Sequence, residues 1–166
     1  MARRIGTAGY HVLLPNMYYR SGREGAYGYD LSRIRIDDAE RTKMFAVMNT
    51  LTNAKVVSDT GPMLDFIRSQ DAAATGPVGC VGYCMSGRFV MAPTGLQFAA
   101  PTILTHSDFR FIVTEQLQQA GIDHRIEIYP DTEHGFAFPE RAVYRKAAAE
   151  RHWERMLALF DRKLRS

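Results

Sequence analysis

The sequence predicts an α/β protein, in which a mostly parallel sheet is covered by helices on both faces. Short apolar runs that suit strands alternate along the chain with stretches whose apolar residues recur at helical spacing. The chain has 166 residues, of which 46% are hydrophobic and 23% charged. That composition supports one globular domain with a real core. We therefore expect a single domain over residues 1–166.

The first half of the chain is expected to hold a strand, a polar loop and two helices. Residues 10–15 form an apolar run, and residues 20–38 are polar and contain several glycines. Apolar residues at helical spacing predict a helix over 39–51. A second helix is expected to be capped by Asp59 or Thr60, with Pro62 in its first turn, where proline is tolerated.

The second half is expected to alternate more regularly. Apolar runs predict strands over 78–82, 102–105 and 125–129, and Gly121 ends a short helix over 112–119. The last helix is predicted over 140–164. Its inward stripe is Trp153, Met156, Leu157, Phe160 and Leu164.

The turn after residues 78–82 is the most informative feature of the chain. Cys84 lies at its apex, between Tyr83 and Met85, and residues that suit a helix follow. Such a turn lifts a nucleophilic side chain clear of the sheet, beside backbone N–H groups. His134 follows downstream on a loop that contains a glycine. A thiol and an imidazole in this order suit nucleophilic catalysis.

Four segments together resemble the dienelactone hydrolase family of α/β-hydrolases. They are residues 9–18, 81–87, 120–122 and 129–136, and they follow the family's order over most of the chain. The combination of a Gly-Tyr-Cys turn with a Tyr-Pro…His-Gly-Phe loop is specific. The resemblance implies a three-layer α/β-hydrolase-like sandwich. It also implies a hydrolase that cleaves a carboxylic ester or lactone through an acyl-enzyme.

The resemblance assigns the site residue by residue. Cys84 matches the nucleophile, His134 the general base, and Asp108 the acid that orients the histidine. The backbone N–H of Met85 would hold the developing oxyanion. Asp131 and Asp123 are rival acids, and Asp108 could instead cap a helix.

The substrate pocket is expected to be lined by four side chains, which are Tyr83, Phe136, Phe138 and Arg88. Phe138 stands where dienelactone hydrolases proper have an arginine that grips the substrate carboxylate, which favours apolar substrate groups. Cys80 is expected in the core. No cofactor is expected. No metal is expected either, because no two of the candidate ligands share a helical face, and these candidates are His106, Asp108, His124 and His134.

Two parts of the family pattern have no counterpart in this sequence. The family has strands and an oxyanion loop before the equivalent of Arg3, and another strand and loop where only residues 91–100 remain here. We therefore expect a reduced sheet of about four strands with an uncovered edge, and a monomer or a homodimer. The alternative hypothesis is a catalytically impaired remnant that acts as a binding or oligomerisation module.

Charge and composition limit the partners. The net charge is +3, the sequence pI is near 9.0, and the basic residues are scattered. Nucleic acid is therefore not an expected partner. The chain shows no signal core or apolar span, and its two cysteines suit reduced thiols. We expect a cytoplasmic protein that acts on a small-molecule ester or lactone and binds no membrane.

Overall fold

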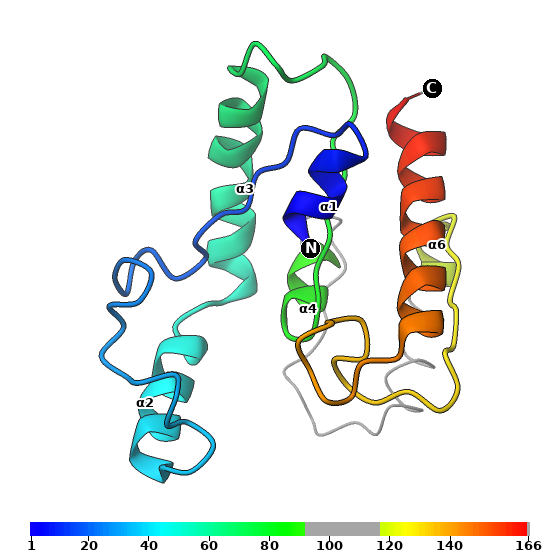
Figure 1. Cartoon of the computed structure of the whole chain (residues 1–166). Coiled ribbons are helices and arrows are strands. Elements are labelled where there is room, and N and C mark those ends of the chain that lie inside the picture. Colours follow the sequence, from blue (N-terminus) through cyan, green and yellow to red (C-terminus); the bar gives the residue numbers. More distant parts are fainter. Residues whose placement is uncertain (92–116, 166) are drawn as a thin grey trace. The chain divides into compact units, whose positions relative to one another are not determined.

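The structure, a computed structural model, describes residues 1–91 and 117–165 (Figure 1). The chain divides into two compact units, Met1–Val78 and Gly79–Ser166. Within the described ranges the regular structure is helical and no strand is formed. The predicted strand over 102–105 and most of the predicted helix over 112–119 lie outside the described residues. The single domain stays a prediction.

The first unit holds α1 (Ala2–Thr7), α2 (Asp38–Asn49) and α3 (Asn53–Arg68), of which α1 was not expected (Figure 1). The helix predicted over 39–51 is confirmed as α2. Its cap is Asp37, whose carboxylate accepts hydrogen bonds from the backbone N–H groups of Ala39 and Glu40 at 2.9 and 3.3 Å. The polar loop that precedes α2 is confirmed, since it contains turns and no regular element.

The predicted start of the next helix is wrong. α3 begins at Asn53, and its cap is Thr52, whose hydroxyl accepts from the N–H of Lys55 at 3.3 Å. Pro62 lies inside the helix instead of in its first turn. Proline has no N–H for the carbonyl four residues earlier, so the helix continues at a cost. Val56 is buried in the N-terminal half of α3, and burial of its apolar side chain favours the helix.

Asp59 is buried because it carries an ion pair, and it does not cap a helix. The Arg20 guanidinium donates to both carboxylate oxygens, at 2.7 and 2.6 Å, and the Tyr19 hydroxyl donates to Oδ1 at 3.0 Å. These charge-assisted hydrogen bonds, with Arg20 the main cause, lower the pKa of Asp59. The pair ties the polar loop to α3.

The second unit holds α4 (Ser86–Met91) and α6 (Lys146–Leu164). The last helix therefore begins at Lys146, six residues later than predicted. Its buried side chains recur at helical spacing and are Ala149, Trp153, Met156 and Phe160. None of the helices in the described ranges combines the length and apolar character that a membrane span requires.

Gly121 ends a helix as predicted. Residues 117–119 are helical, and Gly121 has a positive φ of +63°. The N–H of Ile122 donates back to the carbonyl of Leu117 at 3.0 Å, which closes the helix end.

The three described segments for which strands are predicted, residues 10–15, 78–82 and 125–129, are irregular. Several of their apolar side chains are exposed, including Leu14 at 80% and Ile128 at 63%. An alternating or apolar pattern forms a strand when a neighbouring strand takes up its backbone hydrogen bonds. No described segment does so, and the predicted sheet stays a prediction.

Gly82 lies where the chain passes close to α4. A Cβ atom at this position would collide with the carbonyl oxygen of Ser86 and would lie 2.6 Å from Cγ2 of Val90. A Cβ atom at Gly87, inside α4, would come no closer than 4.0 Å to the carbonyl oxygen of Gly82. The close approach of the turn to its helix therefore requires glycine at 82.

Gly82→Ala is expected to lower the free energy of unfolding by about 1–3 kcal/mol, because the added methyl group must push α4 away from the turn. Urea titration followed by circular dichroism measures the change. Gly87→Ala is the matched control, since its methyl group meets open space and favours the helix. Equal losses in the two variants would contradict the close approach at Gly82.

Asp59→Asn is expected to lower stability near neutral pH and to lose this effect in acid. The folded pKa of Asp59 lies below its unfolded value of about 3.9. Its stabilising contribution is therefore present above that value and is lost as the pH falls through the folded pKa. Urea midpoints of wild type and variant should converge below about pH 4. A gap that does not depend on pH would contradict this linkage.

Candidate functional site

The turn at Cys84 is strained and open to solvent. Cys84 has a φ of +57°, in the left-handed region, and the residue is exposed. This conformation costs a residue other than glycine about 1–2 kcal/mol. Two backbone hydrogen bonds close the turn: the N–H of Ser86 donates to the carbonyl of Tyr83 at 3.0 Å, and the N–H of Gly87 donates to the carbonyl of Cys84 at 3.1 Å. The predicted turn and the helix after it are therefore present.

Tyr83, next to Cys84, is anchored on α6. Its hydroxyl forms a 2.9 Å hydrogen bond with Nε2 of His152 and lies 3.9 Å from Sδ of Met156. Its ring packs edge-on against Phe138, with centroids 5.4 Å apart. Burial raises the pKa of Tyr83 to about 12 and lowers the pKa of His152. The bond therefore joins a protonated phenol to a neutral imidazole at neutral pH.

The segment that carries His134, residues 129–138, packs against the same two side chains, Tyr83 and His152. Tyr129 stacks at a tilt against Phe136 at 5.3 Å and lies edge-on to the His152 ring at 6.4 Å. Phe138 contacts Tyr83, as above. Five side chains thus form one group, here called the aromatic cluster: Tyr83, Tyr129, Phe136, Phe138 and His152. The cluster connects the Cys84 turn with the His134 segment.

A group of charges fixes the start of the His134 segment to α6. The carboxylate of Glu127 pairs with Arg155 at 2.9 Å and with Arg151 at 3.7 Å, both on α6. It also pairs with Arg125 at 2.7 Å and accepts from the Tyr129 hydroxyl at 3.2 Å. This partly buried carboxylate therefore holds the chain that leads into the segment against the helix.

The two candidate catalytic side chains are both exposed. His134 is exposed, and the Gly135 that follows it has a φ of +97°. No hydrogen bond joins the Cys84 thiol to the His134 ring within the described ranges. Asp108 lies outside the described residues. The triad therefore stays a prediction, and the structure brings together the segments that carry two of its members.

The rival acids are both described. Asp123 is largely exposed and pairs with Lys163 at 3.4 Å. Asp131 is exposed, with a φ of +57° in the turn that precedes His134. Neither carboxylate forms a hydrogen bond with the His134 ring in the part of the chain that the structure describes.

The predicted pocket residues occupy packed positions. Tyr83, Phe136 and Phe138 are partly buried in the aromatic cluster. The Arg88 guanidinium lies 4.5 Å over the Phe89 ring, and its Nε atom is buried without a hydrogen-bond partner among the described residues. Their role in binding substrate stays a prediction.

The expectation of a core position for Cys80 is wrong. The residue is exposed, because the segment around it forms no strand, and its sulfur lies 3.9 Å from the carbonyl oxygen of Val90. Atoms around the sulfur still keep it partly from water and raise the pKa of the thiol.

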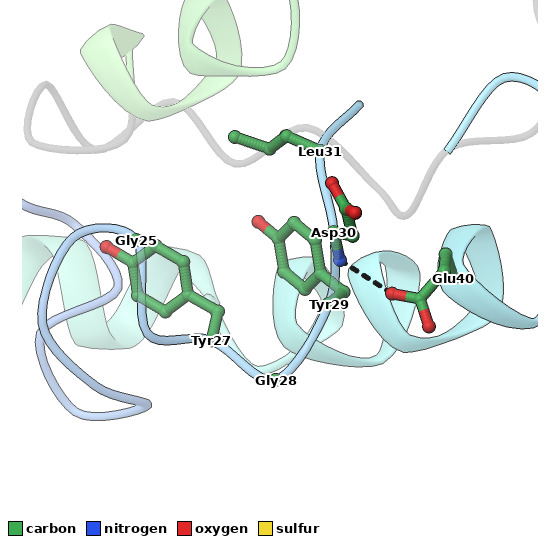
Figure 2. Close-up of a pocket in the computed structure, with 7 residues that line it drawn as sticks. All are labelled: Gly25, Tyr27, Gly28, Tyr29, Asp30, Leu31 and Glu40. Atoms are coloured by element: carbon green, nitrogen blue, oxygen red, sulfur yellow. Dashed lines mark hydrogen bonds between the residues drawn. The ribbon is translucent and has the colours of Figure 1, made fainter. Parts of the chain in front are cut away.

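Two shallow hollows lie elsewhere. The first, of about 500 Å³, belongs to the first unit (Figure 2). In it the backbone N–H of Asp30 donates to Glu40 of α2 at 2.6 Å, and the Tyr27 and Tyr29 rings stack 6.0 Å apart. The second, of about 410 Å³, lies beside the start of α6 and includes Tyr129 and Arg151. Neither hollow is lined by a predicted site residue.

Sequence reasoning missed two residues at the site. His152 lies at helical spacing from the buried Ala149 and Met156, and this spacing could have placed it on the inner face of α6. The second is Arg141, whose side chain lies directly over Gly135. A Cβ atom added at Gly135 would lie 2.9 Å from Cδ of Arg141. Its guanidinium also lies 5.7 Å from the Phe138 ring centroid. No pattern in the sequence signals the position of Arg141.

Comparisons with known proteins identify the family. The model of the dienelactone hydrolase family matches residues 1–107 and 103–164. A protein of Synechocystis sp. (strain ATCC 27184 / PCC 6803 / Kazusa), named "Putative carboxymethylenebutenolidase", is 24% identical over 203 residues, covering 99% of this chain and 80% of that protein. No solved structure matches the chain.

The alignment with the Synechocystis protein is longer than this chain, 203 positions against 166 residues. That protein therefore contains residues without a counterpart here. The two matched parts of the family pattern meet at residues 103–107. Together the two parts cover nearly the whole sequence, so this chain belongs to the dienelactone hydrolase family.

Proposed function

We propose that this protein hydrolyses a carboxylic ester or lactone, with Cys84 as the nucleophile. The observation that carries the proposal is the left-handed backbone of Cys84, an exposed residue other than glycine. Such strain collects at active sites, where the surrounding structure must hold it. The nucleophile of α/β-hydrolases lies on a strained turn of this kind. The family supplies the reaction class, and the name of the Synechocystis relative indicates a lactone.

In the first step the Cys84 thiolate attacks the carbonyl carbon and forms a C–S bond. The backbone N–H of Met85 stabilises the oxyanion of the tetrahedral intermediate. The C–O bond to the leaving group then breaks, and His134, as the imidazolium formed when it took the thiol proton, protonates the departing alkoxide. The product of this step is a thioester, with the alcohol released or, for a lactone, still attached.

In the second step a water molecule attacks the thioester carbonyl while His134 removes its proton. The C–S bond breaks, and the carboxylic acid leaves. Asp108 would orient the His134 ring and stabilise its charged form, as the acid of a triad does. Tyr83, Phe136, Phe138 and Arg88 would bound the substrate.

The proposed fold and compartment follow from the same assignment. Membership of the family supports an α/β-hydrolase fold, and we propose the three-layer sandwich with a reduced parallel sheet. The chemistry requires Cys84 as a thiol, and the protein is proposed to work in a reducing compartment, the cytoplasm. The proposed partner is a small-molecule ester or lactone.

Cys84→Ala is expected to reduce the hydrolysis of p-nitrophenyl acetate to the rate of buffer alone, because the acyl-enzyme can no longer form. Release of p-nitrophenolate, followed by absorbance, measures the rate. Cys80→Ala is the matched control, since it removes the other thiol of the chain and should keep the activity. Equal rates in wild type and Cys84→Ala would remove the nucleophile assignment.

A second candidate function is a non-catalytic binding or oligomerisation module. It is favoured by the exposed apolar side chains of the segments predicted as strands, such as Ile128 at 63%. Exposed apolar segments with unpaired backbone groups invite association with a second chain.

Alkylation of Cys84 by iodoacetamide near pH 7 distinguishes the two candidates, with Cys80→Ala as the protein tested. Iodoacetamide reacts with the thiolate, so a thiol activated by a neighbouring imidazole should react faster than glutathione at this pH and should lose this advantage on acidification. A rate and pH profile like those of glutathione would support the non-catalytic module and contradict the hydrolase.

A further inference from the structure

We propose that His152 of α6 is a positioning residue, which holds Tyr83 and thereby fixes the Cys84 turn against the segment that carries His134. This inference rests on the proposed function, because the reaction of Cys84 defines the correct position. His152 is not assigned to any reacting atom. It acts through its 2.9 Å hydrogen bond to the Tyr83 hydroxyl.

The strained backbone of Cys84 requires support from outside the turn. A left-handed residue with a side chain persists only when neighbouring contacts outweigh its strain. The adjacent side chain, Tyr83, supplies such contacts, because its ring packs on Phe138 at 5.4 Å and on His152 at 5.6 Å. Ring packing is not directional, whereas the hydrogen bond from the Tyr83 hydroxyl to His152 is. This bond therefore fixes the position of the Tyr83 hydroxyl.

His152 also contacts the other half of the site. Its ring lies edge-on to Tyr129, with centroids 6.4 Å apart, and Tyr129 packs on Phe136, two residues after His134. One side chain on a rigid helix is therefore shared by the Cys84 turn and the His134 segment. This shared contact sets the relative position of the two segments.

Loss of the bond would leave the Tyr83 hydroxyl poorly satisfied. The hydroxyl would then have only the Met156 sulfur, 3.9 Å away, as a partner among the described residues, and a thioether sulfur is a weak acceptor. A partly buried hydroxyl then gains by turning toward water, and its motion is passed to Cys84 through one peptide unit. Loss of the bond should therefore lower both the rate of Cys84 alkylation and kcat.

The test uses Cys80→Ala as the parent, so that Cys84 is the remaining thiol. His152→Phe keeps an aromatic ring and removes the hydrogen bond, and Tyr83→Phe removes the same bond from the other side. We expect each to lower kcat for p-nitrophenyl acetate by about threefold to tenfold, the equivalent of one net hydrogen bond, with KM nearly unchanged. The rate of Cys84 alkylation by iodoacetamide should change in parallel.

Two further variants separate positioning from general stability. The double variant should be no slower than either single variant, because both remove one interaction. His152→Gln, whose amide can still bond to Tyr83, should restore most of kcat. A merely structural role would lower the urea midpoint in both His152 variants and leave kcat unchanged. His11→Phe, the same substitution at an exposed site of the first unit, is the matched control.

Each outcome decides the inference. Losses that multiply in the double variant, an unchanged kcat in His152→Phe, or a His152→Gln variant as slow as His152→Phe would overturn it. An inactive parent would refute the proposed hydrolase separately. The alkylation rates then decide the positioning role: a common fall in His152→Phe and Tyr83→Phe supports it, and equal rates in parent and variants overturn it.

Discussion

The left-handed backbone of Cys84 is the constraint on which the rest of the site depends. The sulfur reaches solvent because the chain turns sharply there, and the sharp turn exists because Gly82 lets the chain pass against α4 without a side chain. The strain is held by packing of the adjacent Tyr83 on α6 and on the His134 segment. Gly82 before the turn and the anchored Tyr83 beside Cys84 therefore together keep the Cys84 side chain exposed on an otherwise unfavourable backbone.

The sequence predicted the parts of the structure that depend on local patterns. The apolar spacing of residues 39–51 predicted α2, and the stripe through Trp153 and Phe160 predicted the buried face of α6. The start of α3 was predicted wrongly, because Pro62 suggested a first helical turn, whereas the helix begins at Asn53 with Thr52 as its cap and continues through the proline. Strand patterns failed for a different reason, since a strand depends on a partner that its own residues do not specify.

The candidate site also has parts that local sequence patterns predict and parts that depend on tertiary contacts. The Cys84 turn has a local signature of small residues around the apex and could be predicted, whereas the part played by His152 depends on which residues α6 faces. Arg141 reaches Gly135 because that glycine leaves room for its side chain. Only the three-dimensional structure shows this contact. The predicted acid, Asp108, lies outside the described residues, close to where the two matched parts of the family pattern meet.

The irregular segments 10–15, 78–82 and 125–129 have a consequence for measurements in solution. Their amide groups belong to no ladder in the described ranges, and side chains such as Leu14 and Ile128 face water. Amide protons in such segments are expected to exchange with deuterium faster than those inside α6, whose N–H groups are held in helical hydrogen bonds. If the predicted strands pair, exchange in these segments should slow, so deuterium uptake would report directly on formation of the predicted sheet.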